Sequence, residues 1–441
     1  MAVQDVVRQL VPEARRYTRW ALLHGLVQAG SARGVRSGDL HSLFMTDPQH
    51  RVDPCAFYDQ VRAQGTVVPG RFAAVTASHA VCAELLRSSD FRSGPDEDAM
   101  PWPLRRLIRW SRDPAALGAT DPPSMLVAEP PDHTRYRRLV SRVFTPRAVV
   151  GLRGRIQQIA DDLLDRMAGP GPVDLVDAYA TRLPVAVICE VLGVPAKDHD
   201  RLLRFGHAAA PALDVGIDYG RYRGVDQAIR EFQLWIADHL DHLRREPGPD
   251  LLSQLVHLED DGQRLTEDEL RVTALLLLAA GFETTVNLLG SGAALLLGHP
   301  GQRARLQADP SLWTGAVEEV LRLEAPVQLT GRFALRDTQL GGHRLTRGAL
   351  VLAYLGGANR DPAVFDDPQA FDAGRANARE HLSFSAGRHF CIGASLARLE
   401  GEVGLRSLFE RYPDLALTGP GRRTETVVLR GWEHLPARTA P

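Results

Sequence analysis

An apolar stretch without proline runs from Thr266 to Gly298, and it constrains the fold more than any other feature of the chain. Thr266 and Glu269 have the spacing of a helix-capping box, and the next proline is Pro300. The stretch is therefore expected to form one helix of about 30 residues, roughly 45 Å long. Its residues are apolar on nearly every face, so the helix must run through the middle of a large domain.

The rest of the chain shows no repeat and no long linker, which favours a single large domain from 41 to 441 behind an N-terminal helical extension, 1–40. Apolar residues recur at helical spacing in 150–168 and 222–245. Strand-like alternation is sparse: 66–68 and 72–75 are expected to form a hairpin, and 350–354 and 426–429 are expected to be short strands. The predicted class is mostly α with small β-sheets (α+β).

Charge and cysteine content exclude several classes of protein. The 441 residues contain 52 Lys and Arg against 54 Asp and Glu, with no long run of like charge, so nucleic acid is not expected as a partner. The four cysteines are scattered and form no CxxC pair, which indicates neither a disulfide framework nor a zinc ribbon. Free thiols suit a reducing cytoplasm.

The N-terminal region leaves the location open. Arg15, Arg16 and Arg19 precede the apolar segment 20–23, a pattern compatible with a signal peptide, a helix on the membrane surface, or an amphipathic helix packed on the domain. The longest apolar run, Val272–Phe282, is shorter than the roughly 20 residues that a bilayer span needs, so no membrane span is expected. We expect a cytoplasmic protein, with peripheral attachment to a membrane as the alternative.

The segment from Phe384 to Gly393 combines a glycine-containing loop with Cys391, just before a helical pattern. A thiolate placed there would face free backbone N–H groups and the positive end of a helix, which lower a thiol pKa and favour a metal-bound thiolate. One cysteine without a second nearby suits an axial haem ligand better than a zinc site.

Phe384, Gly387, His389, Cys391 and Gly393 together resemble the haem-binding signature of the cytochrome P450 family, F-x-x-G-x-[HR]-x-C-x-G. The resemblance implies the cytochrome P450 fold, haem b as cofactor, and Cys391 as the ligand of the iron. Phe384 and Gly393 are expected beside the haem. The order of motifs along the chain is similar to that of bacterial, actinobacterial or mycobacterial-like members served by ferredoxins.

The segment Ala280–Thr285 lies in the middle of the long helix and resembles the acid–alcohol pair of the family. A carboxylate and a hydroxyl inside an apolar helix are costly unless they are used or paired. Thr284 can donate a hydrogen bond to the Ala280 carbonyl, and Ala280 is expected against the haem. By resemblance, Glu283 and Thr284 are catalytic and guide protons to oxygen.

Two further sets of charged residues are assigned by resemblance. Glu319 and Arg322 lie three positions apart on one helix face and match the E-x-x-R pair of the family, which a later arginine, here Arg375, completes; this triad is expected to be structural. Haem carries two propionates, which suit cationic donors. The residues expected to bind them are His133, Arg137, Arg332 and His389.

The reaction implied is a haem-thiolate monooxygenation: one oxygen atom of O₂ enters an apolar small molecule, with electrons from NAD(P)H through a ferredoxin reductase and a ferredoxin. By resemblance, the substrate pocket is expected to be lined by Leu276, Ala279, Val327, Gln328, Thr330 and Val427. Two alternatives remain, a peroxygenase driven by H₂O₂ and a non-catalytic haem-binding sensor. The pair Glu283–Thr284 argues against the peroxygenase, because such members tend to replace it.

Overall fold

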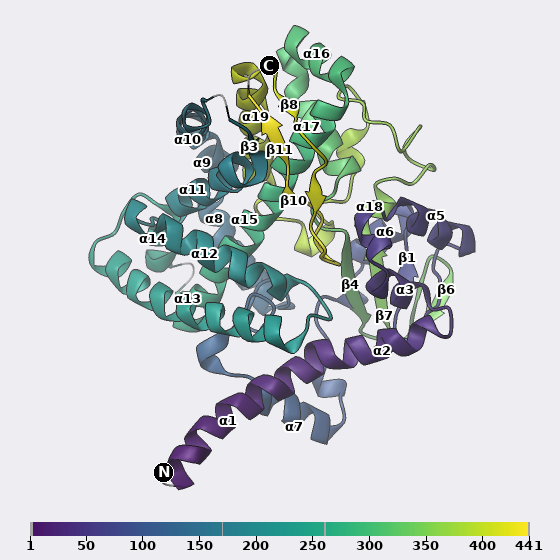
Figure 1. Cartoon of the computed structure of the whole chain (residues 1–441). Helices are drawn as coiled ribbons and strands as arrows, with labels where there is room; N and C mark the ends of the chain where they lie inside the picture. Colours follow the sequence, from purple (N-terminus) through teal and green to yellow (C-terminus); the bar gives the residue numbers. More distant parts are fainter. Residues whose placement is uncertain (1–2, 170, 260–261, 440–441) are drawn as a thin grey trace.

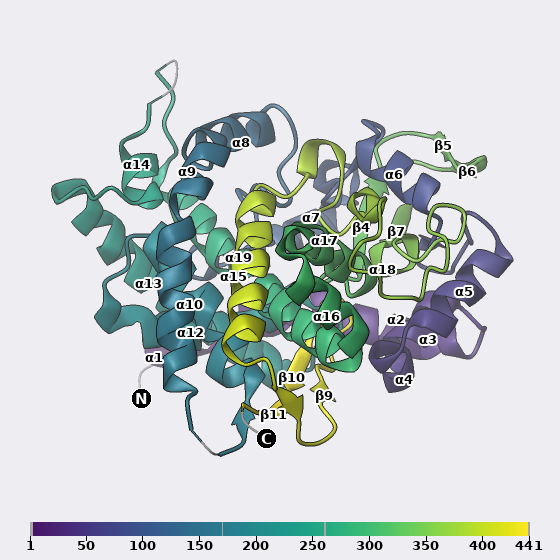
Figure 2. The same ribbon diagram turned by 90° about the horizontal axis from the view of Figure 1, so that it is seen from above.

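A computed structural model describes residues 3–169, 171–259 and 262–439 (Figure 1). One side of the molecule is built from helices, and the other combines small sheets with short helices; the long helix α15 (Glu267–Gly298) lies between them (Figures 1 and 2). Helices α11, α12, α13, α17 and α19 all contact α15. This arrangement confirms the mostly helical class and the central position expected for the long apolar stretch.

The ends of α15 follow from its capping chemistry. The Thr266 hydroxyl accepts a hydrogen bond from the Glu269 backbone N–H, and the Glu269 carboxylate accepts one from the Thr266 N–H at 2.8 Å. The helix ends at Gly298, two residues before Pro300, as predicted. Among the described helices α15 alone is long and apolar enough to cross a bilayer, but 72% of its apolar window is buried inside the protein. It is therefore the core helix of the domain.

The helices that surround α15 occupy most of the chain. Those on the helical side are α8 (Asp132–Val143), α9 (Pro146–Gly151), α10 (Arg153–Arg166), α11 (Arg182–Val191), α12 (His199–Ala209), α13 (Tyr219–Arg245) and α14 (Leu251–His257). Later in the chain come α16 (Pro300–Ala308), α17 (Trp313–Leu323), α18 (Leu355–Ala358) and α19 (Ala394–Arg411). The short helices near the sheet are α3 (Leu40–Thr46), α4 (Pro48–Val52), α5 (Cys55–Gln64) and α6 (His79–Arg87), and α7 spans Trp102–Ser111.

The largest sheet has the strand order β1-β7-β4-β2. Strand β7 (Leu350–Tyr354) pairs in parallel with β1 (Ala74–Thr76) and antiparallel with β4 (Leu329–Ala334), which also pairs with β2 (Phe91–Arg92). The smaller sheets contain β3 (Val173–Asp174), β8 (Ala416–Leu417) and β11 (Pro436–Arg438); β9 (Arg422–Arg423) and β10 (Trp432–His434); and β5 (Thr338–Leu340) and β6 (His343–Leu345).

Two strand predictions were wrong. The expected hairpin is reduced to one bridge between Val68 and Val75, because β1 pairs instead with β7. Residues 426–429 form no strand: the N–H groups of Val427 and Val428 donate to the side chain of Asp214 rather than to a neighbouring strand. The strand expected at 350–354 is confirmed as β7.

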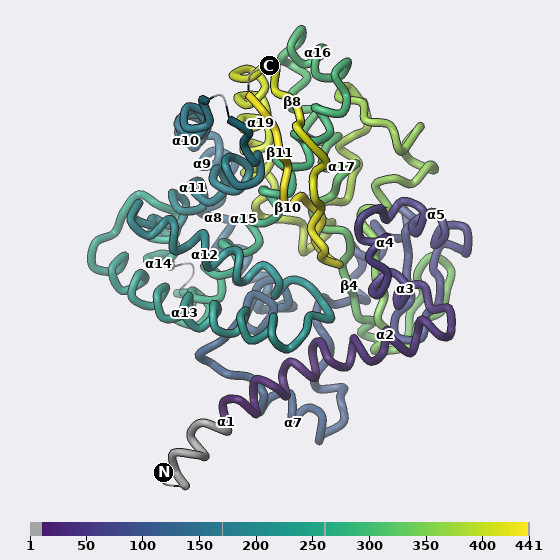
Figure 3. The backbone as a smooth tube through the Cα atoms, in the orientation of Figure 1, coloured from purple at the N-terminus to yellow at the C-terminus, as the bar shows by residue number. Residues whose placement is uncertain are grey.

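The N-terminal extension is helical and lies along the domain. Helix α1 (Val3–Trp20) continues through a π-helical turn (Ala21–Gly25) into α2 (Leu26–Val35), which reaches α3 (Figures 1 and 3). Arg16 pairs with Asp226 of α13 at 2.7 Å. The Trp20 indole N–H donates to the Ile217 carbonyl at 2.9 Å. The extension is thus packed on the domain, across the loop that joins α12 to α13.

Candidate active site

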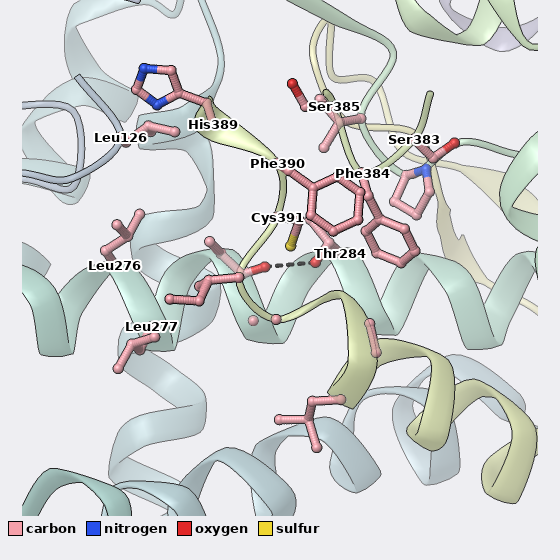
Figure 4. Close-up of a pocket in the computed structure, with 18 of the residues that line it drawn as sticks. Leu126, Leu276, Leu277, Thr284, Ser383, Phe384, Ser385, His389, Phe390 and Cys391 are labelled. Carbon is pink, nitrogen blue, oxygen red and sulfur yellow. Dashed lines mark hydrogen bonds between the residues drawn. The ribbon is translucent and has the colours of Figure 1, made fainter. Parts of the chain in front are cut away.

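A cavity of about 310 Å³ lies beside α15, where the loop of residues 383–393 passes the helix (Figure 4). Its wall is mostly apolar and includes Leu126, Leu276, Leu277 and Phe384. Thr284 and Cys391 line the same space. The cavity therefore brings together the middle of the core helix and the cysteine loop, as the order of motifs predicts.

The cysteine loop is held in shape by its backbone. The Cys391 N–H donates to the Phe384 carbonyl at 2.9 Å, which closes the loop before α19 begins. Gly387 has φ of 66°, and a Cβ atom there would lie 2.5 Å from the Leu86 carbonyl oxygen, so only glycine fits this close approach to α6. The Cys391 thiol is left open to the cavity (Figure 4).

The expected depression of the thiol pKa is wrong for the protein alone. Burial raises the pKa of Cys391, and this effect exceeds the opposing effects of the Gly393 N–H and of the Arg137 and Arg398 guanidinium groups. The thiol of Cys391 would still be deprotonated on binding a metal ion, because the metal replaces the proton on sulfur.

Only one residue of the acid–alcohol pair lines the cavity. Thr284 lines the cavity, and its Oγ1 donates to the Ala280 carbonyl at 2.6 Å, the bond drawn in Figure 4. Thr285 repeats the pattern with Gly281 at 2.9 Å. Glu283 does not line the cavity, and burial raises the pKa of its carboxyl to about 7. A carboxyl with that pKa can both hold and release a proton near neutral pH.

Basic side chains from three elements meet at the cavity wall. His133 and Arg137 lie on α8, Arg332 on β4 and His389 on the cysteine loop. The rings of His133 and His389 are 4.3 Å apart, and the Nε2 atom of each is buried without a hydrogen-bond partner in the described part of the chain. Burial lowers the pKa of His133 to about 4 and that of Arg332 to about 10. Unsatisfied donors in an apolar wall suit a ligand that carries carboxylates.

The predicted triad meets next to the cysteine loop. Arg322 binds Glu319 through two bonds, Nε–Oε2 at 2.6 Å and Nη2–Oε1 at 2.8 Å, and Arg375 Nε reaches Glu319 Oε1 at 3.0 Å. The Arg322 guanidinium also donates to the Asn359 and Pro368 carbonyls at 2.9 Å. The triad thus ties α17 to the segment that leads into the cysteine loop, as a structural role requires.

A second buried carboxylate with a similar role was missed by the sequence analysis. Glu318 pairs with Arg398 of α19 at 2.8 Å and lies 3.0 Å from His381 Nε2, just before the cysteine loop. These partners outweigh burial and lower the pKa of Glu318 to about 2. The signal was present as two consecutive glutamates, 318 and 319, inside an apolar helix pattern.

The other predicted site residues divide into two groups. Those that line the cavity are Leu276, Val327, Thr330, Ala280, Phe384 and Gly393. Ala279 packs in the core instead, and the Gln328 side chain is taken up by hydrogen bonds with the Tyr58 hydroxyl and the Ala325 carbonyl. Val427 lines a separate cavity, because its backbone is fixed to Asp214. The wall residues Met125, Ile188 and Phe390 were not anticipated; Phe390 lies within the signature itself.

Known proteins share both the sequence and the fold. The family model "Cytochrome P450" matches residues 220–416. Cytochrome P450 140 of Mycobacterium tuberculosis is 50% identical over 426 residues, which cover 96% of this chain and 97% of that protein. The 6-deoxyerythronolide B hydroxylase of Saccharopolyspora erythraea is 42% identical over 402 residues, 88% of this chain and 96% of the relative.

The solved structure of a myxobacterial cytochrome P450 in complex with myristic acid has a TM-score of 0.81 and 37% identity; it covers 90% of this chain and 99% of its own. The mycobacterial relative leaves 4% of the chain unmatched, less than the length of the extension, so part of the extension aligns with it.

The residues of the cavity fit the cofactor of this family, haem b. A thiol opens into the cavity beside a small-residue stretch of α15. The buried Nε2 atoms of His133 and His389 have no hydrogen-bond partner among the described residues, and with the Arg137 and Arg332 guanidinium groups on the same wall they form a donor set that suits two propionates. The apolar remainder of the wall suits a flat macrocycle and an organic substrate. With half of its residues identical to a mycobacterial relative over nearly the full length, the chain belongs to the cytochrome P450 family and is a cytochrome P450 monooxygenase.

Proposed function

We propose that the enzyme inserts one oxygen atom of O₂ into an apolar organic substrate, using electrons delivered from NAD(P)H by a ferredoxin reductase and a ferredoxin. One observation carries the proposal: Cys391 and Thr284 line the same apolar cavity. Monooxygenation at a haem requires two groups from the protein, a thiolate that binds the iron and a hydroxyl that donates protons.

The cavity residues have separate tasks in holding the cofactor. Cys391 would hold the haem iron through its thiolate, and the bound haem would supply the activation of O₂. The propionates are bound by four donors, His133, Arg137, Arg332 and His389. Ala280, Phe384 and Gly393 complete the wall around the ring.

Proton supply is assigned to α15. The Thr284 hydroxyl donates to the Ala280 carbonyl and can turn toward the cavity when a better acceptor is present there. The Glu283 carboxyl, with a pKa of about 7, holds the proton that restores this hydroxyl. Because Glu283 does not line the cavity, its proton travels to Thr284 Oγ1 through water or after rotation of the side chain.

The substrate class follows from the wall and from the relatives. Leu126, Leu276, Leu277 and Val327 offer only apolar contacts. One relative is named a vitamin D(3) 25-hydroxylase, and the myxobacterial structure holds myristic acid. Both names support an apolar reacting end, and an extension packed on the domain supports a cytoplasmic location over peripheral attachment to a membrane.

The test begins with the absorbance spectrum of the reduced protein under carbon monoxide, next to Cys391→Ser. We expect the red-shifted Soret band of a thiolate-ligated haem in the wild type and its loss in the variant. A band typical of histidine-ligated haem in the wild type would contradict the assignment of Cys391.

A second experiment tests the proton path and separates the alternatives. Thr284→Ala should keep its haem but divert electrons from NAD(P)H into peroxide instead of product. Unchanged coupling would contradict the role of Thr284. Turnover with H₂O₂ but with no ferredoxin would indicate a peroxygenase, and tight ligand binding without turnover would indicate a sensor.

A further inference from the structure

Helix α7 is an amphipathic helix that stands out from the rest of the domain. It packs on α1 at the lower edge of the molecule in Figure 1. Its inner side is formed by Leu104 and Ile108, which are half-buried. The outer side carries three large apolar residues, Trp102, Leu107 and Trp110, whose exposed fractions are 62%, 40% and 39%.

The apolar residues of the outer side lie among arginines. Trp102, Arg106 and Trp110 follow one another at four-residue spacing, so they form one stripe, and Leu107 lies beside it. The Arg106 guanidinium lies 5.7 Å from the centroid of the Trp102 ring, and Arg15 of α1 lies at the same distance from the Trp110 ring. Exposed tryptophan and leucine gathered on one face of a helix mark an interaction site.

The charge of this region is positive. Three arginines lie in α7 and Arg112 follows it, whereas the helix itself contains no acidic residue. Arg105 and Arg109 share one carboxylate, that of Asp98, at 3.3 and 3.4 Å, and Arg112 pairs with Glu97. Four guanidinium groups thus meet two carboxylates, which leaves a positive excess for an anionic partner.

Tryptophan, leucine and arginine on one exposed face fit an anionic lipid surface. Tryptophan rings settle at the level of the lipid headgroups, leucine reaches the acyl chains, and arginine is attracted to anionic headgroups. A soluble anion would pair with the arginines but would leave Trp102, 62% exposed, and Leu107 in water. A bilayer of anionic lipids accommodates both kinds of side chain.

The position of α7 in the sequence connects this surface with the active-site cavity. The segment 94–124, which contains α7, begins directly after Ser93 and ends directly before Met125 and Leu126. These three residues line the cavity. Docking of α7 therefore brings a segment that borders the cavity to the bilayer, where an apolar substrate dissolves. This use of the surface rests on the proposed function, whereas binding to lipid does not.

From these observations we infer that α7 is a docking site for anionic membranes. Trp102, Leu107 and Trp110 enter the interface, and the three arginines of α7 bind lipid phosphates. A helix of ten residues buries a limited apolar area, so the attachment is reversible and suits a cytoplasmic enzyme. The extension is not the anchor, because its Trp20 and Arg16 are used in contacts with the domain.

The experiment measures co-sedimentation of the haem-loaded full-length enzyme with two kinds of lipid vesicle. One contains phosphatidylglycerol and phosphatidylcholine in equal parts, and the other contains phosphatidylcholine alone. We expect binding to the anionic vesicles, accompanied by a blue shift of tryptophan emission. Binding to the neutral vesicles should be about 100-fold weaker, because the arginines lose their anionic partners. Added salt should weaken binding to the anionic vesicles.

Two pairs of variants locate the binding surface. Leu107→Gln should weaken binding to anionic vesicles about tenfold, because it removes apolar area that enters the membrane. Its matched control is Leu417→Gln, at a leucine that is 41% exposed on β8. Arg106→Gln should weaken binding about fivefold, and its control is Arg438→Gln, at an exposed arginine of β11. Strands β8 and β11 lie far from α7 in Figure 1, so both controls should bind as the wild type does.

The outcomes test this inference separately from the proposed function. No binding to anionic vesicles, equal binding to both kinds of vesicle, or equal affinities in wild type, Leu107→Gln and Arg106→Gln would overturn the inference. Binding to polyglutamate without binding to vesicles would assign the surface to an acidic protein and would overturn it as well. Vesicle binding does not depend on turnover, so failure of the carbon monoxide test leaves this result readable.

Discussion

Buried carboxylates occur in two environments in this enzyme. On α17, Glu318 and Glu319 are surrounded by arginines, and the partners of Glu318 lower its pKa to about 2. On α15 and α19, Glu283 is half-buried and Glu400 is buried, and neither has such a partner among the described residues: the pKa of Glu283 rises to about 7, and that of Glu400 rises well above its ordinary value. The Oε2 atom of Glu400 is buried without a partner in the described residues.

Carboxyls with arginine partners and carboxyls without them serve different purposes. Removing a carboxylate from water is unfavourable in both places, and only fixed guanidinium groups with hydrogen bonds offset it. Where they are present, the charge is permanent and the carboxylate joins segments of the frame. Where they are absent, burial favours the protonated form of the carboxyl, which is useful beside a cavity where protons are consumed.

The largest effect is expected from breaking the paired environment. Glu319→Gln leaves the buried Arg322 guanidinium without its carboxylate partner, so the free energy of unfolding should fall by about 3–5 kcal/mol. Denaturant unfolding of the haem-loaded protein measures this loss. A decrease below about 1 kcal/mol would mean that the triad behaves like an exposed ion pair.

The unpaired environment should appear in the pH dependence of stability. Between the ordinary pKa of 4.5 and the folded value of about 7, unfolded Glu283 ionises while the folded group stays protonated. The free energy of unfolding should therefore fall as pH rises through this window, by at most about 3 kcal/mol. Glu283→Gln removes the group, so the difference between wild type and variant should change from pH 4.5 to 7 and stay constant above it. A difference that does not vary with pH would contradict the raised pKa.

The same variant tests the use of the proton. If Glu283 restores the proton of Thr284, Glu283→Gln should slow product formation about 100-fold, the lower range for general acid catalysis. The ratio of product formed to NAD(P)H consumed should fall with it, while the spectrum of the reduced carbon monoxide complex stays unchanged. Full coupling in the variant would assign the proton supply to another group.

The smallest effect is expected at Glu400. Because burial raises the pKa of its carboxyl well above the ordinary value and so favours the neutral form, Glu400→Gln should change the free energy of unfolding by less than about 1 kcal/mol. Glu433→Gln, which breaks the exposed pair with Arg422, should also cost less than about 1 kcal/mol and serves as the surface reference. If Glu400→Gln lowered the free energy of unfolding as much as Glu319→Gln does, Glu400 would have to be ionised. The distinction between paired and unpaired buried carboxyls would then fail.

Local chemistry explains why parts of this fold could be predicted from the sequence. The bounds of α15 follow from a capping box and a proline, and Cys391 and Thr284 were assigned to one site because two motifs identified them. The segment 426–429 could not be assigned correctly, since its backbone is satisfied by Asp214, more than 200 residues earlier. The direction of the thiol pKa also escaped prediction, because it depends on how much water the folded chain excludes.

The bond between Trp20 and Ile217 gives the enzyme a built-in optical reporter. The indole belongs to the extension, and its acceptor belongs to the loop before α13, so a shift of that loop changes the surroundings of the chromophore. Trp20 also packs against Tyr17 and Tyr219, with ring centroids 5.4 and 5.3 Å away. Comparing the emission of the wild type with that of Trp20→Phe isolates this signal, so opening of the loop can be followed in real time without an attached dye.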